Sequence, residues 1–153
     1  MAAEFTLYSA YHQYNLDGTI DLMADTIKML LVTSDYTPEV THEVLGDVLT
    51  SPSPEVEAVA SPDNGYTQGG EELTGKVVTK TDSPAAGTFD ADDLTWSALT
   101  ATFRYGILYA EKTVDEIVDP LIGYVLFDST PGDVTVSGVD WVCRWSSNGI
   151  ITN

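Results

Sequence analysis

Basic residues are scarce in this sequence. Its 153 residues include 24 Asp and Glu but only 6 Lys and Arg, which gives a formal net charge of -18. Proteins bind phosphate backbones and anionic lipid through Lys and Arg, which neutralise charge and release counterions. The composition therefore argues against nucleic-acid and membrane-surface binding. Two interpretations of the excess acid stay open: a solvated face that keeps the protein soluble, and docking against a basic partner surface.

Cysteine and long apolar runs are also rare. Cys143 is the single cysteine, so neither a disulfide nor a metal-thiolate cluster can form within one chain. It lies in the apolar stretch Trp141-Val-Cys-Arg-Trp145 and is predicted to be a small core residue. No segment approaches the length of a transmembrane run, and the first residues lack the basic region of a secretion signal. Synthesis in a cytoplasm without export is expected.

Motifs of catalysis and cofactor binding are missing. His12 and His42 do not form a His-Glu-x-x-His zinc pattern, and no Gly-x-Ser-x-Gly nucleophile elbow occurs. The stretch Gly65-Tyr-Thr-Gln-Gly-Gly70 has neither the Lys nor the following helix that would cradle a phosphate, so it predicts a turn. We expect a protein that is not an enzyme and that needs no cofactor.

Two acidic corners offer the hard oxygen ligands that calcium prefers. The first contains Asp90, Asp92 and Asp93, but it lacks the Gly and Glu of an EF-hand loop. The second contains Asp115, Glu116 and Asp119. Solvated turns are the default interpretation of both corners and bound calcium is the alternative, so no metal site is predicted.

The remaining pattern predicts one mainly β domain over residues 1–153. Apolar residues make up 43% of the chain, which is enough for a core, and 153 residues are too few for two well-filled cores. Short apolar or alternating segments separated by turn residues predict an antiparallel β-sandwich or curled sheet. One or two short helices are expected from the N-terminal third. The predicted strands are residues 26–33, 77–81, 94–97, 100–110, 121–127, 134–137, 139–145 and 150–152.

Individual segments carry more specific predictions. The apolar runs 26–33 and 121–127 are typical of strands buried on both faces, whereas the alternation in 100–110 predicts one buried face. Valines at helical spacing behind Thr37-Pro38 predict a helix up to residue 49. Residues 51–75 are rich in Ser, Pro and Gly and predict a long loop used for contact. The turn Asn148-Gly149 predicts a hairpin at the end of the chain.

Aromatic residues provide the candidate contact sites. Tyr8, Tyr11 and Tyr14 lie in an N-terminal helical segment, residues 1–20, which is closed by Asp17-Gly18. This tyrosine stripe either packs on the protein's own sheet or forms a contact arm. Trp96, Trp141 and Trp145 lie on predicted strands, where core packing is favoured over a platform for a glycan.

An ordered set of short motifs resembles a family of small virion structural proteins of tailed bacteriophages. The resemblance runs from about residue 17 to the end of the chain, with a longer insert at residues 50–62. The motifs, in order, are Asp17-Gly-Thr-Ile-Asp-Leu22, Asp25-Thr-Ile-Lys-Met-Leu-Leu-Val-Thr-Ser-Asp-Tyr-Thr-Pro38, Gly65-Tyr-Thr-Gln-Gly-Gly70, Phe89-Asp-Ala-Asp-Asp-Leu-Thr-Trp96, Arg104-Tyr-Gly-Ile-Leu-Tyr109, Leu121-Ile-Gly-Tyr124 and Asn148-Gly-Ile150.

The resemblance implies a structural component of an assembled virion without enzymatic activity. The leading hypothesis is a capsid decoration, or cement, protein that binds the outer surface of the phage head and bridges major capsid subunits. A tail, neck or fibre-associated protein is the alternative. The expected partners are the major capsid protein or other virion proteins, together with further copies of this chain. Tyr8, Tyr11, Tyr14 and Tyr66 are the expected contact residues, on the assumption that they are exposed.

Overall fold

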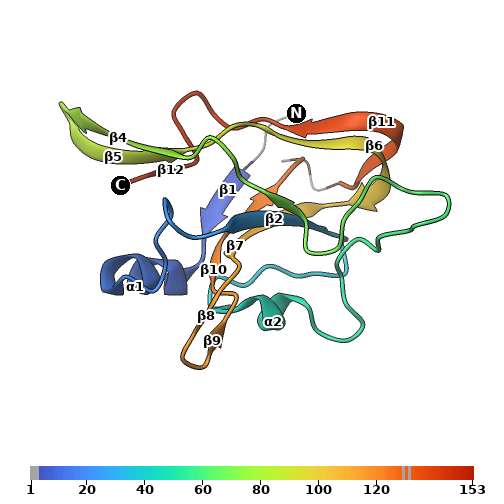
Figure 1. Ribbon diagram of the computed structural model, residues 1–153, viewed down its shortest axis with the longest axis horizontal. Coiled ribbons are helices and arrows are strands. Elements are labelled where there is room, and N and C mark those ends of the chain that lie inside the picture. The colour runs from blue at the N-terminus through green and yellow to red at the C-terminus, as the bar shows by residue number, and fades with distance from the viewer. Residues whose placement is uncertain (1–3, 129, 131) are drawn as a thin grey trace.

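The computed structural model describes residues 4–128, 130 and 132–153 of the chain. Strands account for 45% of the residues and helices for 9%, and the sheets are antiparallel, which confirms the predicted mainly β class. Figure 1 shows two layers of strands, with the helices and long loops gathered around the lower layer. Residues 1–3 of the predicted N-terminal segment lie outside the described part.

The first layer is a five-stranded antiparallel sheet in the order β1-β10-β7-β2-β3. Its strands come from both halves of the chain, so the sheet joins segments that are distant in sequence. In sheet order the bounds are Glu4–Leu7 (β1), Leu121–Leu126 (β10), Tyr105–Ala110 (β7), Ile27–Val32 (β2) and Glu71–Glu72 (β3).

The second layer contains a long two-stranded ribbon and a three-stranded sheet. The ribbon pairs β6 (Leu94–Phe103) with β11 (Val134–Cys143), and the three-stranded sheet has the order β12-β5-β4. A further small hairpin projects from the lower layer in Figure 1. The remaining strands are β4 (Val77–Asp82), β5 (Ala85–Asp90), β8 (Thr113–Val114), β9 (Ile117–Val118) and β12 (Ile151–Thr152).

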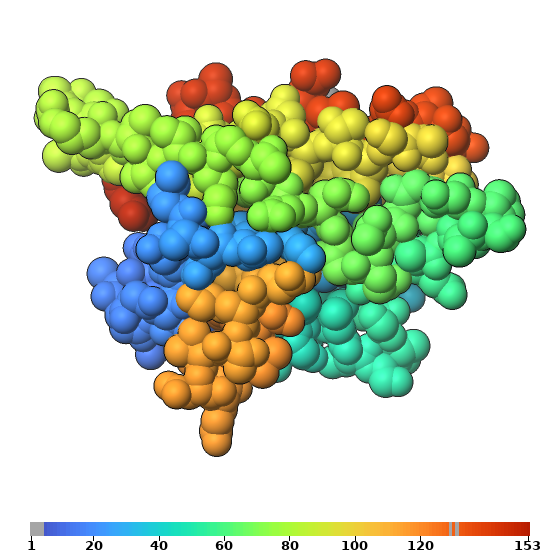
Figure 2. Space-filling view, in the orientation of Figure 1, coloured from blue at the N-terminus to red at the C-terminus, as the bar shows by residue number. Residues whose placement is uncertain are grey.

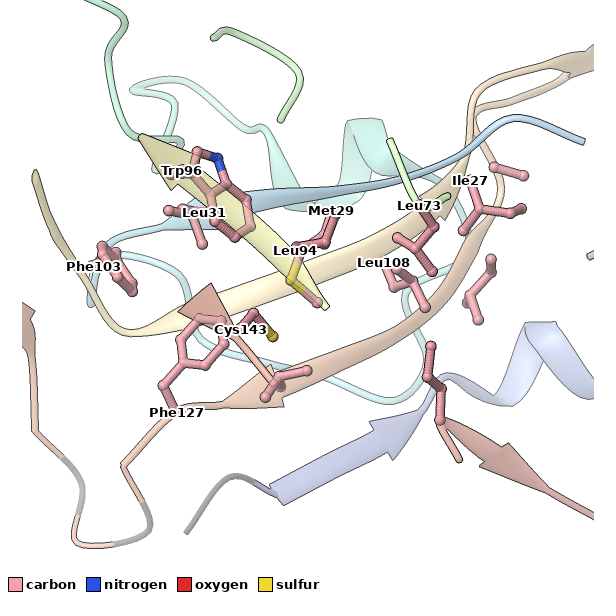
Figure 3. Packing of buried hydrophobic residues seen from close by; sticks show 14 of the residues in the cluster. Ile27, Met29, Leu31, Leu73, Leu94, Trp96, Phe103, Leu108, Phe127 and Cys143 are labelled. Carbon is pink, nitrogen blue, oxygen red and sulfur yellow. The ribbon is translucent and has the colours of Figure 1, made fainter. Parts of the chain in front are cut away.

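The main core lies between the two layers, and a second apolar cluster covers the opposite face of the first layer. Strand β2 contributes to both, because Met29 and Leu31 point into the main core and Leu30 and Val32 into the second cluster. Figure 3 shows the main core with labelled side chains from β2, β6, β7 and β11, together with Leu73 and Phe127, which follow β3 and β10. The prediction that residues 26–33 form a strand buried on both faces is confirmed.

The prediction of a helical segment over residues 1–20 is wrong for residues 4–7, which form strand β1 and pair with β10. Helix α1 (Ser9–Asp17) ends as predicted at Gly18, which adopts a left-handed conformation with φ 80°. The predicted helix behind Thr37-Pro38 is wrong, since only α2 (Leu45–Val48) is helical. Backbone groups that a longer helix would use are instead bonded to other segments. The Val40 carbonyl accepts the Ser9 amide at 2.8 Å, and Val44 forms a bridge with Pro120. Tertiary pairing therefore overrides the helical spacing of the valines.

Three strand predictions need correction. Residues 100–110 are not one strand, because β6 ends at Phe103 and β7 begins at Tyr105 as the chain passes from one layer to the other. Strand β7 consequently has apolar clusters on both faces rather than on one. The predicted strands 134–137 and 139–145 are the single strand β11, whose register shifts around Gly138. Strand β12 pairs with β5 and not with the preceding strand, so the terminal hairpin is wrong.

Candidate partner-binding surface

The four tyrosines that the sequence offered as contact residues are buried. Tyr8, Tyr11, Tyr14 and Tyr66 each expose between 0% and 4% of their surface, so the expectation that they are exposed is wrong. Tyr11, Tyr14 and Tyr66 belong to the main core, and Tyr8 belongs to the second cluster. The stripe on α1 therefore packs against the protein's own sheets, which was the other interpretation of this pattern.

Tyr66 fastens the long 51–75 segment to the edge of β2. Its hydroxyl donates to Glu55 Oε1 at 2.9 Å and accepts the amide of Leu31 at 3.2 Å. The same carboxylate oxygen accepts the Gly69 amide at 2.6 Å, and the Tyr109 hydroxyl donates to the Gly69 carbonyl at 2.7 Å. Burial, with the nearby Glu55 carboxylate, raises the pKa of Tyr66 far above its ordinary value. The neutral phenol is thus a structural hydrogen-bonding group.

Backbone pairing adds to this attachment. The amide of Thr33 donates to the Pro54 carbonyl at 2.8 Å, and the amide of Val56 donates to the Leu31 carbonyl at 2.9 Å. The amide of Leu73 donates to the Ile27 carbonyl at 2.8 Å. The segment is a long connection as predicted, containing only the two-residue strand β3 and isolated bridges. It covers the outer edge of β2 and so protects that edge from pairing with another chain.

A second hydrogen-bonded chain links Tyr8, Tyr36 and His42. The two tyrosine hydroxyls are 2.8 Å apart, and the Tyr36 hydroxyl lies 3.0 Å from His42 Nδ1. The next group is Glu39, 3.9 Å from His42 Nε2. Tyr8 at the inner end is fully buried, and burial raises its pKa far above the ordinary value. A substrate cannot reach this phenol, and the chain of contacts holds the loop before α2 against the sheet.

The tryptophans take part mainly in core packing. Trp96 is buried, and the ring of Trp141 lies 4.8 Å from Phe103 and 4.9 Å from Phe127 between ring centroids. Trp145 is partly buried and donates its indole N–H to the Asp92 carbonyl at 3.1 Å. The rings therefore do not form a shared open platform, and core packing accounts for their positions.

In each acidic corner at least one carboxylate accepts a backbone amide. Asp93 accepts the amide of Trp145 at 3.0 Å, and Asp119 accepts the amide of Lys112 at 3.2 Å. Burial raises the pKa of Asp119. Within the described residues no group of three or more His, Cys, Asp or Glu side chains has a metal-binding arrangement. The contacts of Asp93 and Asp119 fit the interpretation of the corners as turns.

The hairpin formed by β4 and β5 is the least buried part of the sheet structure. All six residues of β4 are exposed, although its side chains alternate between two faces. Figures 1 and 2 show the hairpin, which we call the arm (residues 77–90), extending away from the body at one end of the upper layer. Phe89 is the single buried residue of the arm, and strands that bury so little surface are only marginally stable in water. An arm of this kind is expected where a partner supplies the missing contacts.

Hollows flank the arm on both faces. The inner hollow, about 410 Å³, lies between the arm, α1 and the segment after α1, and Met23 and Val78 are exposed at its border. The outer hollow, about 460 Å³, has a floor of small β-branched and alanine side chains with few charges. The floor residues of the outer hollow are Val77, Thr79, Thr81, Ala86, Thr88 and Thr152.

The outer side of the β6–β11 ribbon continues this weakly charged surface. Strand β6 has no charged residue, and β11 has only Asp140, whose carboxylate accepts the Ala98 amide at 2.9 Å. Hydroxyl side chains are paired across the ribbon, as in Thr102 and Thr135 at 3.1 Å. We call this surface the hydroxyl face. Its exposed hydroxyl residues are Thr95, Ser97, Thr100, Thr102, Thr135 and Ser137.

Acidic residues gather elsewhere. Half of the 24 acids lie between Asp17 and Glu72, in the helices and loops around the first layer, and this stretch of sequence contains one basic residue, Lys28. Lys112 forms an ion pair with Asp25 of the stretch. The molecule therefore has a strongly acidic side and a hydroxyl-rich, weakly charged side. Sequence reasoning recognised β4 but missed β5 and the arm. The available signal was Ser83-Pro84 between two stretches with few large apolar residues, of which only Phe89 is buried in the core.

Neither helix in the described part of the chain has the length and apolar character needed to cross a membrane. No protein-family model, curated protein or solved structure shows significant similarity to this chain.

Proposed function

We propose that this protein is a non-enzymatic structural component of a tailed-bacteriophage virion, and specifically a decoration protein that binds the outer surface of the head and bridges major capsid subunits. The motif order from residue 17 onward supports membership of a virion. The observation that carries the choice of a decoration protein is the separation of the acidic side from the hydroxyl face.

The hydroxyl face is suited to lie against another protein. It is built on two ten-residue strands and has a single charged residue among them, so docking desolvates few charges. Protein interfaces are depleted of charge at their centres in the same way. Hydroxyl groups that already bond one another, such as Thr102 and Thr135, keep these partners when water is removed.

The acidic side would then face solvent. A net charge of -18 keeps crowded copies apart and limits unspecific aggregation. Binding strength would come from bridging, because a copy already held on one capsid subunit meets the neighbouring subunit as an intramolecular partner. Such linkage raises the overall affinity by a factor of roughly 10²–10⁴ without any new contact.

Two measurements on particles that carry the gene test the assignment. Quantitative mass spectrometry gives the copy number, and an image reconstruction gives the position of the chain. Hundreds of copies on intact heads are expected. A handful of copies on isolated tails, necks or fibres would contradict decoration while keeping a virion role, and absence from the particle would contradict both.

Two variants, each with one added charge on a different side of the molecule, test which surface binds the head. Thr95→Glu adds one negative charge to the hydroxyl face, and Thr41→Glu adds the same charge to an exposed site on the acidic side. In a sedimentation assay with heads that lack this protein, we expect Thr95→Glu to bind at least tenfold more weakly than Thr41→Glu. Equal binding by the two variants would remove the hydroxyl face as the docking surface.

A further inference from the structure

The outer edge of the arm is open. In the three-stranded sheet β4 is the last strand, and no strand within the described residues pairs with its other side. The hydrogen bonds of β5 show which backbone groups of β4 point toward this open edge. The Gly87 amide donates to the Asn153 carbonyl at 3.3 Å, and the Gly87 carbonyl accepts the Asn153 amide at 2.9 Å. The polar backbone groups of Gly87 therefore face β12. Because these groups alternate along a strand, those of Ala86 and Thr88 face β4.

The alternation then determines which groups of β4 point outward. Thr79 and Thr81 are paired with Thr88 and Ala86, so their backbone groups face β5. The amide and carbonyl groups of Val78 and Lys80 are consequently directed at the open edge. An exposed edge of this kind is a template for pairing with another strand, and proteins usually cover it or block it with bulges and charges.

We propose that the β4 edges of two copies of this chain pair antiparallel about a two-fold axis and join the two three-stranded sheets into one. Antiparallel pairing of identical strands is self-complementary, as closed two-fold symmetry requires. The proposal uses only this chain's own arm, so it does not depend on the proposed role in a virion.

The charges on β4 select the register. A two-fold axis perpendicular to the sheet makes one residue face its own copy, and two registers then pair five residues of the six in β4: residues 77–81 centred on Thr79, or 78–82 centred on Lys80. The register centred on Lys80 places two ammonium groups directly opposite each other, which is destabilising. The register centred on Thr79 avoids this contact.

The Thr79 register also gives suitable neighbours on both faces. On the outer face Val77 lies opposite the second copy's Thr81, and the two Thr79 side chains meet, so β-branched residues pair across the junction. On the inner face Val78 lies opposite the second copy's Lys80, whose methylene groups can cover it while the ammonium stays in water. Lys80 keeps its ion pair with Asp82, at 2.6 Å, within its own chain.

Proline substitution tests whether the edge is used. Lys80→Pro removes an amide that points to the open edge and leaves the hydrogen bonds to β5 in place, as proline on edge strands generally does. Lys80→Ala is the matched control, because it removes the same side chain and ion pair but keeps the amide. In sedimentation equilibrium of the full chain, wild type and Lys80→Ala should show reversible doubling of mass with concentration, and Lys80→Pro should stay monomeric.

Cysteine pairs test the register. Residues in a non-hydrogen-bonded antiparallel pair have Cα atoms about 4.5 Å apart, within the range of a disulfide. Thr79→Cys should therefore form a covalent dimer under mild oxidation. Thr81→Cys should not, because two residue 81 positions are separated by about four residues, or roughly 13 Å along the strands. The native Cys143 is buried and forms a common background for both variants.

The outcomes separate cleanly. A wild-type chain that remains monomeric at every concentration, together with no cross-link from Thr79→Cys, overturns the proposal. Efficient cross-linking of Lys80→Cys in place of Thr79→Cys overturns the register. Dimerisation that persists in Lys80→Pro overturns the edge contact, provided that circular dichroism shows the same β content as in Lys80→Ala. None of these results bears on whether the chain is found in virions.

Discussion

Substitution of two glycines with nearly identical φ angles provides a stringent test of how the 51–75 segment is held. Gly18 has φ 80° and Gly70 has φ 82°, so alanine at either position must adopt the same unfavourable positive φ. Their surroundings differ completely. A Cβ on Gly18 would have no atom within 4 Å, whereas a Cβ on Gly70 would lie 1.9 Å from the Met29 carbonyl oxygen and 2.7 Å from Leu30 Cα.

The structure gives the size of the expected effects. The left-handed conformation alone costs alanine about 1–2 kcal/mol, which is the full effect expected for Gly18→Ala. At Gly70 the clash is with the backbone of β2, so the turn itself must move away. That movement breaks the bonds of Tyr66 and Gly69, worth about 1 kcal/mol each, and leaves the Leu31 amide unpaired at about 1–3 kcal/mol. We expect Gly70→Ala to lose about 4–7 kcal/mol.

Urea unfolding followed by tryptophan fluorescence measures both losses in the free energy of unfolding. Gly70→Ala should also increase amide exchange at Leu31, whose partner Tyr66 lies in the displaced segment, and at Val56, which belongs to that segment and loses the Leu31 carbonyl. Equal destabilisation by the two substitutions would refute the close packing of this turn on β2. A loss at Gly70 without faster exchange at these amides would show that the segment stays in place.

Three further predictions follow from individual side chains. Tyr66→Phe should lower the free energy of unfolding by about 2–3 kcal/mol in urea titrations, since it removes a buried hydroxyl from Glu55 and Leu31, and an unchanged value would contradict the network. Burial raises the pKa of Cys143 to about 12, so its thiol should resist a thiol-specific chromophoric reagent at neutral pH until the protein is unfolded; rapid reaction of the native protein would disprove burial. The amides of Glu43 and Val44 hold the pKa of Asp47 below its ordinary value of 3.8, so this carboxylate contributes stability above that pH and loses it as the pH falls toward the folded-state pKa. The stability advantage of wild type over Asp47→Asn, about 0.5–1 kcal/mol at pH 7, should therefore shrink below about pH 4, and an advantage independent of pH would refute the assignment.

The apolar pattern of the sequence was sufficient where both faces of a strand are covered by apolar clusters. The apolar runs of β2 and β10 predicted strands buried on both faces, and Asp17-Gly18 predicted the end of α1. Periodicity failed where a distant segment takes over the backbone. The valines before α2 have helical spacing, yet the Val40 carbonyl is occupied by Ser9 and Val44 is bridged to Pro120.

The candidate surface was harder to predict for a different physical reason. The sequence does not distinguish a tyrosine with a buried ring from one with an exposed ring. Tyr11 and Tyr66 therefore fitted a contact surface and a core equally well. The structure buries both. The arm was missed for another reason. A strand is recognised in a sequence by its one apolar face, and β4 has no buried face. Its pairing with β5 depends on a turn at Ser83-Pro84 that the local pattern does not specify.

The order of strands in the first layer has a consequence for the time course of folding. The opening strand β1 pairs with β10, so residues 4–7 have no partner until residues 121–126 have been synthesised. Until then β1 and the tyrosines of α1 lack the sheet on which they rest. Contacts between such remote segments slow folding, because the chain must lose the entropy of closing a large loop before the stabilising contacts form. The first layer can therefore be completed only after residues 121–126 have emerged from the ribosome.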